Sequence, residues 1–155
     1  MDQQVEMESL KEQMGRIIEE ARMLLPGIQA LFGFQTIAVF NEPFKHLPML
    51  VQDCHLAALA LVVVAIALVM LPAAYHRQAE PFHISRHAIS LSSRCICYAL
   101  APLAGAISLD VFVVLQMVTG APTLSAISAG AAFLLLISVW FGYPQLMRRK
   151  FERAG

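Results

Sequence analysis

Long apolar runs separated by short polar segments dominate the chain after residue 23. The strongest run, Leu56 to Tyr75, contains no charged side chain, which is typical of a helix that crosses a lipid bilayer. Two further runs, at about residues 95–118 and 124–143, have the same character. The polar connection before residue 95 is expected to become helical from about Ser85, and Pro144 to close the last span.

A shorter run, Leu24 to Phe40, predicts one more span at the start of the series. At about 1.5 Å of rise per residue it only just reaches across a thin hydrocarbon core. Pro26 is expected in its first turn, where the missing backbone N–H does little harm. The chain is therefore predicted to have four membrane helices.

Residues 3–22 have a different pattern. Apolar side chains recur there at alternating spacings of three and four, as in an amphipathic helix; they are Met7, Leu10, Met14, Ile17, Ala21 and, just beyond, Leu24. The segment is acidic, whereas helices that lie on anionic lipid are usually basic. We expect this helix to pack on protein, either on its own cytoplasmic loops or on a neighbouring subunit; a solvated lead-in helix is the alternative.

Composition supports the membrane interpretation. Apolar residues make up 58% of the chain and charged residues 14%, against about 45–50% and about 25% in soluble domains. The predicted fold class is all-α: an integral membrane four-helix bundle, one domain over residues 1–155, with an amphipathic cytoplasmic N-terminal helix. The formal net charge is +0, so lipid, not nucleic acid, is the expected partner.

The basic residues are distributed unevenly along the chain. Ten of the eleven precede the first span, separate the second from the third, or follow the fourth. They are Lys11, Arg16 and Arg22; Arg77, Arg86 and Arg94; and Arg148, Arg149, Lys150 and Arg153, with only Lys45 on the opposite side. Because short cytoplasmic flanks are enriched in Lys and Arg, both termini are predicted to be cytoplasmic.

Asp110 is the first candidate for function, because it lies well inside the third predicted span. A carboxylate in the hydrocarbon core is costly and normally faces the bundle interior, a partner or water. It would suit ion coordination, a proton relay or a pore-lining ring. The alternatives are a hydrogen-bonded carboxyl that joins helices and a carboxylate hydrated near the outer interface.

Gln29 and Gln35 are further polar residues, both within the first predicted span. Gln35 is expected at a depth close to that of Asp110, since the two helices run in the same direction, and a hydrogen bond between them is a concrete expectation. Such amides commonly join helices; lining a polar pathway is the sharper hypothesis.

Neither a cofactor, a metal nor an enzymatic activity is expected. The histidines and cysteines are His46, His55, His76, His83 and His87, and Cys54, Cys95 and Cys97. The histidines lie at or beyond the ends of the predicted spans, which does not suit paired haem ligands. A cytoplasmic group of possible metal ligands has no spacing typical of a zinc site; it consists of His76, His83, His87, Cys95 and Cys97. No P-loop, metalloprotease or nucleophile-elbow motif is present.

Two stretches carry a family resemblance: Glu19 to Phe44, and MLPAAYHR at residues 70–77. Their characteristic positions are Glu20, Arg22, Pro26, Gly27, Gln29, Leu31, Phe32, Phe34, Pro72, His76 and Arg77. With the four-span layout they resemble a family of small bacterial membrane proteins known only as a domain of unknown function. The resemblance implies an inner-membrane protein and brings no activity or cofactor.

The resemblance draws attention to the cytoplasmic interface between the first two membrane helices. Arg22 and the pair His76 and Arg77 are expected to meet there, with Glu20 pairing with Arg77 or His76. The alternative is ordinary anchoring by positive charge on the cytoplasmic side.

Two functional classes remain open. The leading hypothesis is a homo-oligomeric ion channel or small transport protein that uses Asp110, Gln35 and Gln29, because one copy is too small to enclose much of a pathway. The competing class is a non-transporting scaffold, or a regulatory or stress-response subunit. Such a protein would dock a cytoplasmic partner through its N-terminal helix and basic tail.

Overall fold

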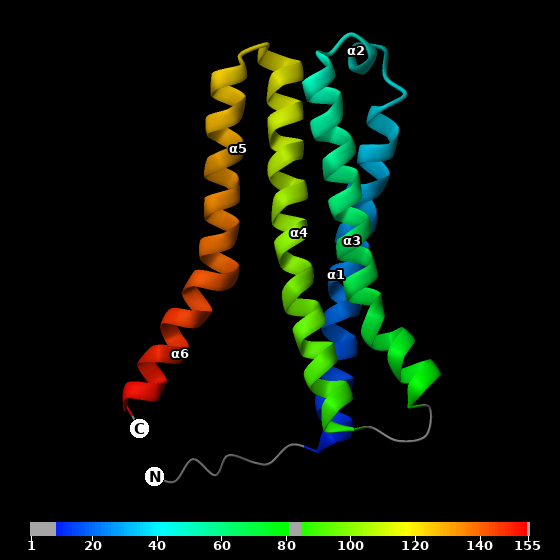
Figure 1. The fold of residues 1–155 in the computed structure, drawn as a ribbon, viewed down its shortest axis with the longest axis vertical. Helices are drawn as coiled ribbons and strands as arrows, with labels where there is room; N and C mark the ends of the chain where they lie inside the picture. The colour runs from blue at the N-terminus through cyan, green and yellow to red at the C-terminus, as the bar shows by residue number, and fades with distance from the viewer. Residues whose placement is uncertain (1–8, 81–84, 155) are drawn as a thin grey trace.

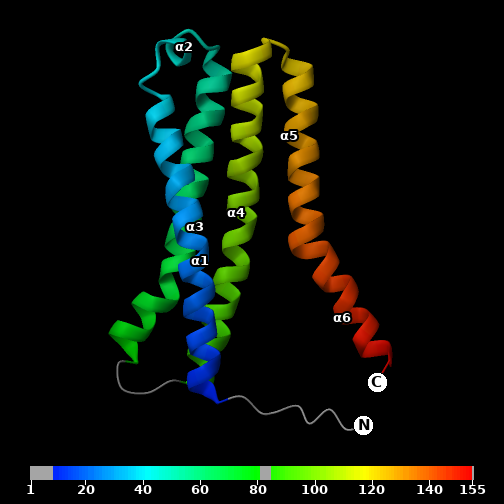
Figure 2. The same cartoon turned by 180° about the vertical axis from the view of Figure 1, so that it is seen from behind.

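The computed structural model describes residues 9–80 and 85–154, and every regular element within them is helical (Figure 1). The elements are α1 (Leu10–Ala38), α2 (Glu42–Lys45), α3 (Met49–Ala79), α4 (Arg86–Thr119), α5 (Pro122–Ile137), the π-helical turn η1 (Ser138–Gly142) and α6 (Tyr143–Ala154). The chain runs along α1, back along α3, forward along α4 and back along α5 and α6 (Figures 1 and 2). The predicted all-α class is confirmed.

Ser9 defines the start of α1. Its hydroxyl accepts a hydrogen bond from the backbone N–H of Glu12 at 3.3 Å, and the Glu12 carboxylate accepts one from the backbone N–H of Ser9 at 2.9 Å. This reciprocal pair is a capping box, which satisfies two backbone donors that the helix leaves free. The hydrogen bond from the Ser9 hydroxyl, followed by the one from its backbone N–H, lowers the pKa of Glu12 below its ordinary value.

The helix predicted at residues 3–22 and the span predicted from Leu24 form one continuous helix, α1, within the described residues; residues 3–8 lie outside them. Pro26 is therefore inside a helix, and its predicted place in a first turn is wrong. Buried side chains on both sides of Pro26, among them Ala21 and Ile28, hold α1 against its neighbours. This packing offsets the one backbone hydrogen bond that proline removes.

The helices α3 and α4 contain the second and third predicted spans and extend beyond them. α4 begins directly after Ser85, whose hydroxyl accepts a hydrogen bond from the backbone N–H of Ala88 at 3.0 Å. The expected helical start at this residue is confirmed. Pro72 lies inside α3, and the last part of this helix leans away from α1 and α4 (Figures 1 and 2), as expected of a helix in which a proline interrupts the hydrogen-bond ladder.

Pro144 does not close the fourth predicted span. The π-helical turn η1 precedes it, and helical structure continues through α6 to Ala154. The backbone N–H of Tyr143 bonds to the carbonyl of Ser138, five residues back. A widened turn of this kind accommodates a proline ring that would clash with the carbonyl four residues earlier in an α-helix. α6 then leans away from α4 (Figures 1 and 2).

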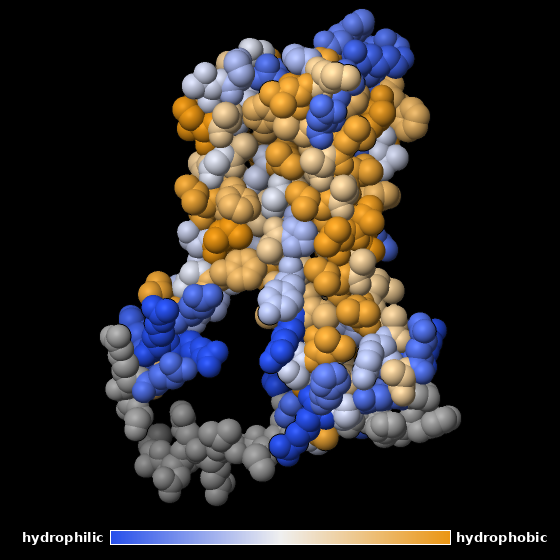
Figure 3. Space-filling model, in the orientation of Figure 1, coloured by the Kyte–Doolittle hydropathy of each residue, from blue (hydrophilic) through white to orange (hydrophobic). Residues whose placement is uncertain are grey.

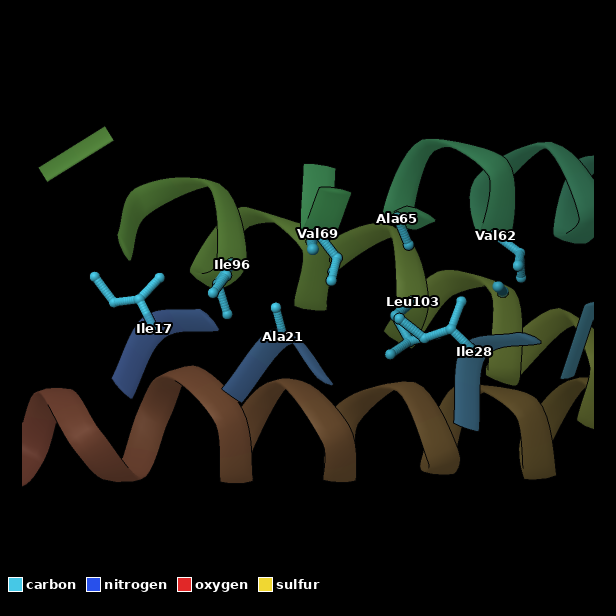
Figure 4. Close-up of a cluster of buried hydrophobic side chains, with 10 residues drawn as sticks. Ile17, Ala21, Ile28, Val62, Ala65, Val69, Ile96 and Leu103 are labelled. Atoms are coloured by element: carbon cyan, nitrogen blue, oxygen red, sulfur yellow. The ribbon is translucent and has the colours of Figure 1, made fainter. Parts of the chain in front are cut away.

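The hydrophobic core lies between α1, α3 and α4. Figure 4 shows side chains of the three helices converging there; the buried members include Ile17, Ile28, Val62, Val69, Ile96 and Leu103. Small residues allow the close approach of α3 and α4, since a Cβ added at Gly105 would lie 3.1 Å from Leu61 Cδ1. This is the use of small residues expected between membrane helices.

α5 departs from the predicted four-helix bundle. It packs mainly on α4, whereas α1, α3 and α4 pack on one another. Of its residues only Ser125 is buried, and large side chains such as Leu124, Ile127 and Leu134 are exposed. A helix that is apolar on all sides has no single apolar stripe to face the other helices. Lipid can cover its remaining surface equally well.

Three helical segments of the described chain are long and apolar enough to cross a membrane: Met49–Ala79, Arg86–Thr119 and Pro122–Glu152. Figure 3 shows the apolar band that they form, with hydrophilic residues gathered at both ends. α1 is not among the three, because Pro26, Gln29 and Gln35 dilute its apolar character.

Candidate functional site

Three polar side chains from three helices meet near the end of the bundle at which α1 finishes and α3 begins. Gln35 comes from α1, His55 from α3 and Asp110 from α4. Gln35 Nε2 donates a hydrogen bond to Asp110 Oδ2 at 2.7 Å, and His55 Nδ1 lies 4.0 Å from Asp110 Oδ1. We call these three residues the polar cluster. The expected hydrogen bond between Gln35 and Asp110 is confirmed.

The second ring nitrogen of His55 determines its tautomer. His55 Nε2 lies 2.9 Å from the backbone carbonyl oxygen of Gln35. A carbonyl oxygen only accepts, so Nε2 must carry the proton and donate. This carbonyl is among the last four of α1, which lack partners within the helix. His55 therefore caps α1 and turns Nδ1, which is unprotonated in the neutral ring, towards Asp110.

The polar cluster is shielded from its surroundings. Gln35 is 3% exposed and His55 2% exposed, and the Asp110 side chain is 18% exposed. Phe44 of α2 covers the imidazole edge-on, with ring centroids 5.0 Å apart. Among the described residues Gln35 Oε1 is a buried acceptor without a hydrogen-bond donor, so the cluster has more acceptor capacity than its own donors use.

His55 is the residue that the sequence analysis missed. The second span was predicted to begin at Leu56, but α3 begins at Met49, which brings His55 into the helix. The periodicity contained the signal: the buried positions of α3 are Val51, His55, Ala58, Val62, Ala65, Val69 and Pro72. These recur every three or four residues, so His55 continues the stripe that faces the core.

Gln29, the other predicted pathway residue, is not part of the polar cluster. It is exposed on α1, whereas Gln35 is buried. The two are six positions apart, and at 3.6 residues per turn this puts them on different faces of one helix. Gln116 instead joins α4 to α5, since it accepts a hydrogen bond from the Ser125 hydroxyl at 3.3 Å.

The residues predicted at the opposite end of the bundle divide between two cavities. Arg22, His76 and Arg77 line one cavity between α1 and α3, as expected. Glu20 lines another, beside Arg16 and residues of α4. The predicted pairing of Glu20 with His76 or Arg77 is wrong, because residues two apart on a helix, such as Glu20 and Arg22, point in different directions.

Within residues 9–80 and 85–154, no group of three or more His, Cys, Asp or Glu side chains is placed to hold a metal ion. His83, part of the cytoplasmic group considered from the sequence, lies outside these residues. What the polar cluster offers chemically is one imidazole, one carboxyl group and one carboxamide in contact. Such a set can hold a proton or coordinate a small cation through oxygen.

Long apolar helices with a buried polar cluster define a multi-pass α-helical membrane protein. The chain belongs to the family described as "Family of unknown function (DUF6328)", whose model matches residues 3–144. The resemblance found in the sequence is thereby confirmed over nearly the whole chain. Comparisons with curated proteins and with solved structures returned no match.

Proposed function

We propose that the protein is a small transport protein of the cell membrane, which works as a homo-oligomer and moves a proton or a small cation through the polar cluster. The observation that carries this proposal is a partly buried carboxyl group 4.0 Å from a fully buried imidazole, between apolar helices. Ionisable groups in such places are expensive, and they commonly mark ion or proton pathways.

The polar cluster has the chemistry of a site for one exchangeable proton. Nε2 of His55 is committed to the carbonyl of Gln35, so a further proton has two places in the cluster, His55 Nδ1 and the Asp110 carboxyl group, whose nearest atoms lie 4.0 Å apart. It can reside on Asp110 beside a neutral ring, or on His55 beside a carboxylate. Both forms have the same net charge, so transfer between them does not change the charge held in the membrane.

Gln35 supports the release of a proton from Asp110 and the binding of a small cation. Its amide donates to Asp110 Oδ2, which stabilises the carboxylate after the proton has left. Its Oε1 atom has no donor among the described residues. With the carboxylate, this oxygen supplies the hard ligands that a small cation prefers.

A fourth membrane crossing by α1 completes the proposed architecture. α1 begins at the end of the molecule where α6 finishes (Figure 1), and an even number of crossings brings both ends to one side. The bias of Lys and Arg in the flanks assigns that side to the cytoplasm of a bacterial inner-membrane protein. The polar cluster then lies towards the outer face.

Association between copies is supported by α5. Its large apolar side chains are exposed, and Ala126 and Gly130 stand four apart on its exposed surface. A Cβ added at Gly130 meets no atom within 4 Å. Small residues at this spacing permit close helix contacts in lipid, which would enclose a pathway that one copy leaves incomplete.

Flux through liposomes tests the proposal. The number of copies in the purified protein would first be measured by native mass spectrometry. The protein would then be reconstituted into liposomes, and the entry of protons, Na⁺ and K⁺ would be followed under an imposed membrane potential. We expect flux of one of these ions, which Asp110→Asn lowers on the order of a hundredfold, the scale of a positioned proton-transfer group. No flux from the unaltered protein, or flux indifferent to Asp110→Asn, would reject transport.

Asp53→Asn is the matched control. Asp53 lies on α3 two positions before His55, but its side chain is exposed. The same chemical change is made there at the same end of the bundle without touching the polar cluster. We expect wild-type flux from this variant, and a comparable loss of flux in both variants would assign the effect to surface charge.

One observation favours the competing class of docking or regulatory protein. α6 leans away from α4 and carries Arg148, Arg149 and Lys150, together with exposed Leu146 and Phe151. Such a basic amphipathic helix suits a protein or membrane surface. Silent liposomes together with a cytoplasmic partner lost on deletion of residues 143–155 would favour this function.

A further inference from the structure

The cavity between α1 and α3 has a polar and an apolar part. It has a volume of about 300 Å³ and lies at the end of the bundle opposite the polar cluster. Arg22, His76 and Arg77 supply its polar lining, and Leu25 and Met70 are among its apolar residues. None of the described residues that line it is acidic. A cavity that combines cationic and apolar walls selects an anionic, amphiphilic occupant.

Pro72 explains why the cavity exists. It lines the cavity from α3, and the last part of α3 leans away from α1 (Figures 1 and 2). The lost backbone hydrogen bond allows this divergence. Ala21 and Ala73, which also line the cavity, are too small to fill the space that the divergence opens.

The polar groups of the cavity have no protein partner among the described residues. Within the described residues, neither Arg22 nor Arg77 has a hydrogen-bond or ion-pair partner. His76 Nδ1 is buried and has no hydrogen-bond partner there either. Arg22 and Arg77 are exposed to solvent, so both guanidinium groups are accessible to an anion. Anchoring by positive charge alone does not account for the buried imidazole nitrogen that lines the same cavity.

We propose that this cavity binds an anionic phospholipid, whose phosphate contacts Arg22, His76 and Arg77 and whose acyl chain starts along Leu25 and Met70. Basic pockets between membrane helices hold lipid headgroups in this manner, through charge-assisted hydrogen bonds. The volume suits a headgroup and the first part of a chain, with the remainder on the outer surface of the helices. The site is independent of the polar cluster and does not require that the protein transports an ion.

The test is native mass spectrometry of the full-length protein titrated with phosphatidylglycerol or with phosphatidylcholine of identical acyl chains. We expect retention of phosphatidylglycerol in preference to phosphatidylcholine. The double variant Arg22→Gln and Arg77→Gln should weaken retention by about tenfold, the scale of lost charge-assisted hydrogen bonds. Equal retention of the two lipids would overturn the proposal.

Two further variants distinguish lipid binding in the cavity from a general effect of positive charge and from misfolding. Arg86→Gln with Arg94→Gln removes the same charge from exposed positions of α4, and it should leave retention unchanged. Ala73→Phe keeps every charge but fills the apolar part of the cavity, and it should weaken retention as well. A loss of retention in the α4 variant equal to that in the cavity variant would overturn the proposal, as would full retention in Ala73→Phe.

The source of the phosphate group is tested in the same titration. Excess inorganic phosphate should not displace phosphatidylglycerol, because it lacks the acyl contacts with Leu25 and Met70. Displacement by phosphate alone would identify a site for a soluble anion and would reject the lipid.

Discussion

His55 joins the structural and the chemical parts of the polar cluster. Its Nε2 caps the carbonyl of Gln35, and its Nδ1 faces Asp110 at 4.0 Å. One side chain thereby fixes the end of α1 against α3 and orients an ionisable nitrogen within the bundle. Removal of this side chain should affect both the stability and the chemistry of the cluster.

The stability of a His55→Leu variant measures the capping role. The substitution leaves the Gln35 carbonyl buried without its donor, which costs about 1–3 kcal/mol. We expect a lower unfolding temperature in detergent. His46→Leu is the control, since His46 is exposed and surface changes are usually within about 0.5 kcal/mol. Equal stability of the His55→Leu variant and the wild-type protein would show that the cap is dispensable.

Part of the site could be predicted from single residues. The contact between Gln35 and Asp110 follows from their similar depth in two helices that run in the same direction, because the rise per residue of an α-helix is fixed. Depth alone does not give the direction of a side chain around the helix, and Gln29 and Glu20 both face away from the partners predicted for them. His55 was missed because hydropathy marks where lipid begins, whereas α3 extends into the polar segment before it.

Among the helical elements, Pro26 and Pro144 lie inside continuous helical structure although the sequence predicts a first turn and a span end there. Proline favours a helix end when only local propensity decides. Here α1, α3 and α4 each contain an interior proline, and α6 contains Pro144 close to its start. In lipid every broken helix exposes backbone groups that water cannot satisfy, so continuing the helix past a proline is the less costly outcome.

Gly120 is the one described residue with a positive φ, at +65°, and it ends α4. Gly120→Ala should lower stability by about 1 kcal/mol, because a Cβ disfavours the left-handed conformation. Gly15→Ala, in the interior of α1 with open space around it, should instead raise stability by about 0.5–1 kcal/mol. Unfolding temperatures in detergent compare the two, and a rise for Gly120→Ala would contradict the assigned conformation.

At the scale of the whole molecule, the sequence predicted the class of protein better than its packing. Apolar length and charge bias indicate spans because lipid selects for both. They do not indicate which faces meet, and α5 packs mainly on α4 although it was expected in a four-helix bundle. Packing in lipid depends on small residues such as Gly105 and on polar contacts such as Gln35 with Asp110, which hydropathy does not resolve.

In the proposed function, the whole molecule connects the proton site at Asp110 to water. Infrared spectroscopy of the protein in liposomes, recorded as the external pH is varied, tests it directly. We expect a carboxyl band that changes with pH, is absent in Asp110→Asn and shifts in His55→Gln, since His55 Nδ1 lies 4.0 Å from the carboxyl group. A spectrum in which no band assigned to Asp110 responds to pH would rule out a proton site there and leave the polar cluster as a contact that only joins helices.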